Sequence, residues 1–246
     1  MLHPLSSPPP GAEATQSPKM HSRAVVWARV VLVYGCLEGA LWSVRSFRGI
    51  WALAAATLIA SFLVCDLLGG YQRVRDLGIG LRGLAQGWWI PPAAAVLSGS
   101  IVLMAWRVGT LHSLFGPAGY YVHASGYALW TVVQEFIAQS FFFQQLQSIL
   151  KPRKAILANG LLFAIAHWPN PILVPVTLVG GCILTGWFYR YRNIYLLAIA
   201  HTLVALSIAV SVPDNVHRHM RVGVGYEHYL PHVQHGSRRW SPTPPR

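Results

Sequence analysis

Residues 132–145 read VVQEFIAQSFFFQQ and lie inside one apolar run, residues 124–146, with the sequence ASGYALWTVVQEFIAQSFFFQQL. A helix needs about 20 predominantly apolar residues to cross a bilayer, and this run is long enough. It nevertheless holds one carboxylate, Glu135, and four glutamines. Polar groups at that depth are costly unless they face a protein interior or a wet cavity. The stretch therefore predicts a membrane helix that packs against other helices and turns its polar side chains inward.

The composition supports the same conclusion. Of the 246 residues, 54% are hydrophobic and only 11% are charged, whereas soluble domains carry about 25% charged residues. The sequence predicts an all-α, polytopic transmembrane helix bundle with about seven spans. Their expected positions are roughly 24–44, 49–68, 86–106, 124–147, 154–168, 171–190 and 193–212. The fifth is short and ends at the helix-breaking run His167–Pro171, so whether it crosses fully is open.

The chain is expected to have three parts. Residues 1–23 form a disordered polar tail, residues 24–212 a membrane-embedded helical domain, and residues 213–246 a polar C-terminal tail. This last part contains five histidines: His217, His219, His228, His232 and His235. For these we favour a solvated tail over a weak metal site.

The formal net charge is +12. The lysines and arginines lie in short clusters between apolar blocks, where such residues normally hold cytoplasmic loops in place. The sequence has no basic stripe interleaved with aromatic residues, the pattern that would indicate nucleic-acid binding. We therefore expect membrane lipids and no nucleic acid as partners. The charge bias places the N-terminus and the loop Lys151–Lys154 in the cytoplasm. The sequence thus predicts a multi-pass protein of the cell membrane, expected to be a bacterial inner membrane.

Three ionisable residues lie in three separate apolar blocks: Glu135, His167 and His201. Each one alone is explained by a hydrogen bond between helices. Three such costly groups on separate spans favour a shared site, since a packed bundle can bring them together.

These segments resemble the motifs of the CAAX protease and bacteriocin-processing family of intramembrane endopeptidases. The family pattern is Glu-Glu-x-x-x-Arg, then Phe-x-x-x-His, then His-x-x-x-Asn. Here residues 134–139 read QEFIAQ, residues 163–167 read FAIAH and residues 201–205 read HTLVA. The resemblance covers about residues 120–210 and is carried by the order, the spacing and the membrane context of the motifs. It implies that Glu135, His167 and His201 are catalytic, with a Glu and a His activating water and the later His steadying the oxyanion.

Three motif positions depart from this pattern. Gln134 replaces the Glu to which the family assigns water activation, Gln139 replaces the Arg, and Ala205 replaces the Asn that helps to hold the oxyanion. Neighbouring residues of an α-helix point about 100° apart, so Glu135 can replace residue 134 only after a helix rotation or a local bulge. Residues 135 and 139 are spaced i and i+4, which places a carboxylate opposite an amide on one helix face.

The resemblance implies a hydrolase, an intramembrane endopeptidase that cleaves a peptide bond of a membrane-associated or lipidated protein with Glu/His-activated water. The substitutions leave open a second function, a family member that binds a membrane protein or peptide without cleaving it. A small transporter is a third alternative, which the absence of internal repeats disfavours. A zinc ion held by Glu135, His167 and His201 also stays open, because catalytic zinc commonly takes three protein ligands, although no HExxH helix supports it.

Overall fold

The computed structural model describes residues 22–43, 56–57, 60–61, 77–81, 83–113 and 117–229. In this part of the chain every regular element is a helix. The elements are α1 (Arg23–Ser43), α3 (Leu84–Gly87), α4 (Ile90–Val108), α5 (Pro117–Glu135), the π-helix η2 (Phe136–Phe143), α6 (Gln144–Ile149), α7 (Pro152–Ile165), α8 (Leu173–Tyr191), α9 (Ile194–Ser211), α10 (Asp214–His217) and α11 (Gly223–Glu227). The predicted all-α bundle is confirmed.

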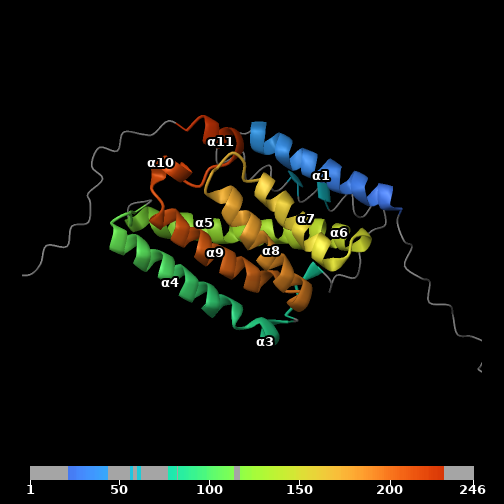
Figure 1. The fold of residues 1–246 in the computed structure, drawn as a ribbon, viewed down its shortest axis with the longest axis horizontal. Coiled ribbons are helices and arrows are strands. Elements are labelled where there is room, and N and C mark those ends of the chain that lie inside the picture. Colours follow the sequence, from blue (N-terminus) through green and yellow to red (C-terminus); the bar gives the residue numbers. More distant parts are fainter. Residues whose placement is uncertain are drawn as a thin grey trace, which may run out of the picture.

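The helices pack around α9, which is the most apolar of the helices long enough to cross a membrane and is buried along much of its length. It lies between α4 on one side and α5 and α8 on the others (Figure 1). α7 packs along α8, and α1 covers the outer side of the bundle, where it contacts α6 and α11. Because α5, α7 and α9 carry the three motifs, this packing brings distant segments of sequence together.

Four helical stretches are long and apolar enough to cross a membrane: Arg23–Ser43, Leu84–Val108, Leu173–Tyr191 and Ile194–Ser211. They coincide with the first, third, sixth and seventh predicted spans. The predicted span 49–68 lies largely outside the described residues. The predicted span 124–147 is a composite of α5, η2 and α6. The fifth corresponds to α7, whose 14 residues make a helix of about 21 Å, shorter than the roughly 30 Å hydrocarbon core.

The outward face of α4 shows why the bundle needs a membrane. Val96 and Met104 are 72% and 69% exposed, and Leu97 and Leu103 also point outward. Soluble monomers rarely expose apolar surface of this extent. Together with the four long apolar helices, this face is what lipid contact requires, and the chain is a membrane protein.

The crossing of α7 and α8 depends on two glycines. A Cβ atom at Gly160 would lie 2.5 Å from Sγ of Cys182, and one at Gly181 would lie 3.3 Å from Cα of Gly160. Small residues let two membrane helices approach closely, so that dispersion forces between their backbones replace the hydrophobic effect as the source of attraction. The glycines therefore fix where α7 lies, and with it the position of His167 just beyond the end of α7.

We predict that Gly181→Leu destabilises the protein by about 1–3 kcal/mol, the usual cost of overpacking. The measurement is the midpoint of unfolding in detergent. Gly180→Leu is the matched control, because a Cβ at the adjacent Gly180 meets nothing within 4 Å. Equal midpoints for the two variants would show that the helix crossing does not depend on Gly181.

The exposed loop between α6 and α7 offers a test of orientation. Residues 151–154 are all exposed, and the predicted cytoplasmic side follows from their three positive charges. We expect an Arg153→Cys variant, made after replacement of the three native cysteines, to resist an impermeant thiol reagent added to intact cells and to react after the cells are opened. Labelling in intact cells would reverse the orientation.

Candidate active site

The helix that carries the first motif changes its winding directly after Glu135. α5 ends at Glu135, residues 136–143 form the π-helix, and α6 continues the same path. Short π-helical segments inside α-helices are rare and occur frequently at functional sites. A π-helix has a wider turn than an α-helix and so changes the direction of its side chains. Gln134 and Glu135 both precede this segment and lie in α5, so the π-helix redirects the side chains that follow Glu135 and leaves the angle between residues 134 and 135 α-helical.

Glu135 is buried, with 1% of its side chain exposed, and both of its oxygens accept hydrogen bonds. Nδ1 of His201 lies 2.9 Å from Oε1, and Nε2 of Gln139 donates to Oε2 at 3.1 Å. The expected contact between residues 135 and 139 is therefore present. A buried carboxylate is tolerated only when it is paired and hydrogen-bonded, and here α9 and the π-helix supply one partner each.

The network continues into α7 and α8. Nδ2 of Asn159 lies 3.4 Å from Oε1 of Gln139 and donates to Oγ1 of Thr185 at 2.8 Å. Both Asn159 and Thr185 are buried. Sequence analysis missed these two residues, although Asn159 could have been found by the rule that singled out Glu135, since it is a polar residue inside an apolar block.

His167 joins the group through Phe163. The ring of Phe163 lies 4.8 Å from the ring of His167 and 5.7 Å from that of His201, both in edge-on contacts. Nδ1 of His167 lies 2.7 Å from the carbonyl oxygen of Phe163. A carbonyl oxygen only accepts, so Nδ1 carries the hydrogen and Nε2 of the neutral ring holds the lone pair. The structure thus joins Glu135 directly to His201 and places both histidines on one aromatic ring.

The turn after His167 is held by Asn170, which is fully buried. Its Oδ1 accepts from the backbone N–H groups of Ile172 and Leu173, at 3.1 and 3.0 Å. Its Nδ2 donates to the carbonyl oxygens of His217 and Arg221, at 2.9 and 3.0 Å. One side chain therefore caps the start of α8 and binds the C-terminal segment to the turn that carries His167.

Gln134 and Ala205, the other two departures from the family motifs, lie on α5 and α9. The Oε1 atom of Gln134 is buried and has no hydrogen-bond partner among the described residues. Ala205 is buried on α9, one helical turn beyond His201. Gln134 has no group that accepts a proton from water, and Ala205 has none that donates to an oxyanion.

We predict that Glu135→Leu lowers the stability by about 1–3 kcal/mol for each polar group left unsatisfied in the interior. Glu135→Gln should cost clearly less than Glu135→Leu, because its amide can keep both hydrogen bonds. Its amide oxygen can accept from Gln139, and its amide nitrogen can donate to Nδ1 of His201 in the other ring tautomer. Unfolding midpoints in detergent measure both. A Leu variant as stable as the Gln variant would mean that the network does not hold the helices.

The comparison with known protein families gives a match over the part of the chain that contains this site. Residues 118–207 match the model of a protein family described as type II CAAX prenyl endopeptidase Rce1-like. The matched segment contains Glu135, His167 and His201 together with every other residue of their hydrogen-bond network. No curated protein and no solved structure gives a significant match to the chain.

Proposed function

We propose that this chain, whose residues 118–207 match the family model described as type II CAAX prenyl endopeptidase Rce1-like, is an intramembrane endopeptidase. Its substrate would be a membrane-associated or lipidated protein, and a prenylated C-terminal peptide is the form that the family description suggests. The observation that carries the proposal is the contact of 2.9 Å between Oε1 of Glu135 and Nδ1 of His201, inside the segment that matches the family.

The two histidines suit two different steps of peptide hydrolysis. Nε2 of neutral His167 has a lone pair and serves as the general base. It takes a proton from water while the water oxygen attacks the peptide carbonyl carbon. Protonated His201 keeps Nδ1–H on Glu135 and offers Nε2–H to the developing oxyanion. When the carbon–nitrogen bond breaks, His167 returns its proton to the leaving amine.

Glu135 acts on this chemistry through His201. Its side chain is 1% exposed, whereas that of His201 is 10% exposed. The carboxylate therefore fixes the orientation of the imidazole and leaves Nε2 to face the substrate, an arrangement familiar from catalytic triads. Both oxygens of Glu135 are already engaged by protein donors. A zinc ion at Glu135, His167 and His201 stays a prediction, and none of these steps requires it.

One observation favours the second candidate function, binding without cleavage. At the position where the family places its water-activating carboxylate, this chain has Gln134, whose Oε1 atom is buried and unsatisfied. Such an acceptor costs free energy until a donor reaches it. The backbone N–H of a bound peptide is a donor of this kind, so Gln134 fits peptide binding better than it fits hydrolysis.

We predict that Gln134→Glu raises the rate of peptide cleavage, since a general base contributes about 10²–10⁴-fold. The double variant Gln134→Glu, Ala205→Asn should be faster still, because one oxyanion donor contributes about 10²–10³-fold. The assay follows fluorogenic peptides, with and without a prenyl group, cleaved by purified protein in detergent.

The controls separate this effect from a general one. His167→Ala supplies the blank, and Gln147→Glu adds the same carboxylate on α6, where Gln147 accepts from Arg192 instead of belonging to the network. If the original chain cleaves the peptides and Gln134→Glu does not change the rate, Gln134 does not limit hydrolysis and our proposal for this residue is wrong. No cleavage by any variant, combined with peptide binding, would select the second function.

A further inference from the structure

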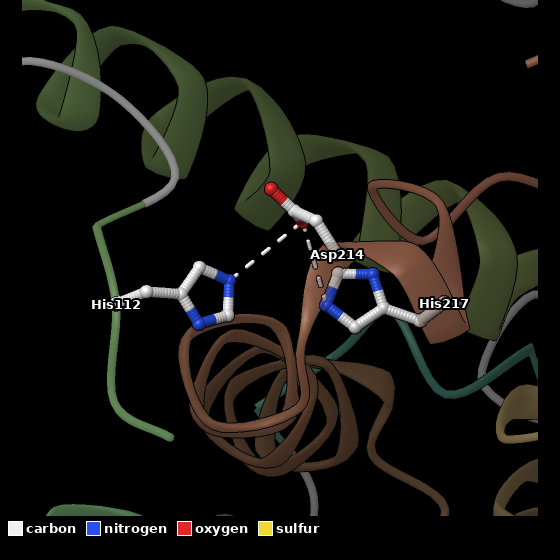
Figure 2. Close-up of side chains that lie close together, drawn as sticks. All are labelled: His112, Asp214 and His217. Carbon is white, nitrogen blue, oxygen red and sulfur yellow. Dashed lines mark ion pairs between the residues drawn. The ribbon is translucent and has the colours of Figure 1, made fainter. Parts of the chain in front are cut away.

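A second group of ionisable side chains lies outside the motif region, beyond the ends of α4 and α9. His112 comes from the segment after α4, and Asp214 and His217 come from α10 (Figure 2). Their ligand-type atoms all lie within 4.8 Å of one another. A backbone hydrogen bond from His112 to the carbonyl of Val210, 3.0 Å long, holds the two segments together. We propose that these three residues form a binding site for a divalent transition metal, with zinc as the reference ion.

The distances fit a shared ion better than they fit direct contacts. Oδ1 of Asp214 lies 3.7 Å from Nε2 of His112 and 3.8 Å from Nε2 of His217. Both separations are too long for hydrogen bonds. Ligand atoms bonded to tetrahedral zinc at about 2.0–2.1 Å lie roughly 3.3–3.5 Å from each other. The three side chains therefore need only small shifts to enclose an ion.

Two of the three ligand atoms have no other partner. Nε2 of His112 and Oδ1 of Asp214 are buried, and neither makes a hydrogen bond to the described residues. Nδ1 of His112 lies 3.1 Å from the carbonyl oxygen of Thr110, so it carries the hydrogen and leaves the lone pair on Nε2. A histidine that binds metal through one nitrogen typically donates its other N–H to a carbonyl in this way.

The charges around Asp214 suit a cation as well. In the part of the chain that the structure describes, its ion-pair partners are histidines only, including His219 at 3.3 Å from Oδ2. The nearby Arg218 turns to the carbonyl and the ring of Tyr226 instead. The site also lies beyond the C-terminal ends of α4 and α9, which favour positive charge.

His217 is the ligand that must change its bonds. Its Nε2 lies 3.2 Å from the carbonyl oxygen of Ala209, and its Nδ1 accepts from the backbone N–H of Met220 at 3.2 Å. Nε2 therefore carries the hydrogen in the absence of metal, and binding releases or relocates that proton. Loss of the Met220 bond weakens binding but does not block it.

The site would act as a clamp on the motif region. The carbonyl of His217 accepts from Asn170, and the backbone N–H of Gly223 donates to the carbonyl of Trp168 at 2.8 Å. These bonds tie the C-terminal segment to the turn directly after His167. An ion joining His112, Asp214 and His217 fixes that segment to α4 and α9, and so makes the position of His167 depend on metal.

The test uses the full chain in detergent, purified without a histidine tag and stripped with a chelator. We expect equilibrium dialysis with elemental analysis to find one tightly bound zinc per chain, and bound Co²⁺ to give the intense visible absorption of a tetrahedral site. His112→Gln and Asp214→Asn should each weaken binding by at least about tenfold, the smallest loss seen when even an outer partner of a metal ligand is removed. Zinc should also raise the unfolding temperature of the original chain but not of Asp214→Asn.

Two controls locate the ion. His228→Gln changes a histidine of the same C-terminal segment whose Nδ1 faces the carbonyl of Val224 instead of the cluster, and the double variant His167→Ala, His201→Ala removes the motif histidines. Both should keep the bound zinc. Asp214→Cys should keep the ion and add a thiolate-to-cobalt charge-transfer band, which requires residue 214 to be a ligand. Absence of micromolar binding, binding unchanged in His112→Gln and Asp214→Asn, or binding lost with the motif histidines would each overturn the proposal.

Discussion

The burial of one carboxylate, that of Glu135, inside the helix bundle constrains the rest of the structure. An isolated charge or unpaired acceptor at that depth costs several kcal/mol, so Glu135 requires donors from neighbouring helices. His201 on α9 and Gln139 on the π-helix provide them, and Asn159 and Thr185 extend the chain of bonds to α7 and α8. The helices are therefore held in register at this level, because sliding any of them would leave a polar group unsatisfied.

The architecture could be predicted from the sequence because the patterns that indicate it lie within short segments of the chain. Apolar blocks of about 20 residues indicate spanning helices whatever they pack against, and the i, i+4 spacing of Glu135 and Gln139 requires no tertiary knowledge. The π-helix could not be predicted, because no spacing in the sequence sets it apart from an α-helix; in the structure Ile137 to Phe143 are all buried in it. The bridging role of Phe163 was equally hidden, because an aromatic residue in an apolar helix carries no signal of which rings it will contact.

In the C-terminal segment, composition led to a wrong prediction about the exposure of a residue. Residues 213–229 are polar and rich in histidine, so a solvated tail was the expectation for His217. That expectation is wrong for this residue, which is fully buried in α10. Its backbone is held by Asn170, a residue 47 positions earlier in the chain. Polarity predicts exposure only when no distant side chain satisfies the polar groups, and a single sequence does not reveal such partners.

Asn170 joins the turn after His167 to the C-terminal segment by hydrogen bonds. An asparagine has two donor hydrogens and an oxygen with two lone pairs, and all four are used here, by two backbone N–H groups of the following helix and two carbonyls of the C-terminal segment. Aspartate lacks the donors, serine offers only one, and glutamine carries the same amide but one methylene group farther from the backbone. The short turn between α7 and α8 is thus held from both sides by one residue, and His167 cannot move independently of the C-terminal segment. The geometry of the turn that carries His167 is therefore set partly by His217 and Arg221, which lie outside the segment that matches the family model.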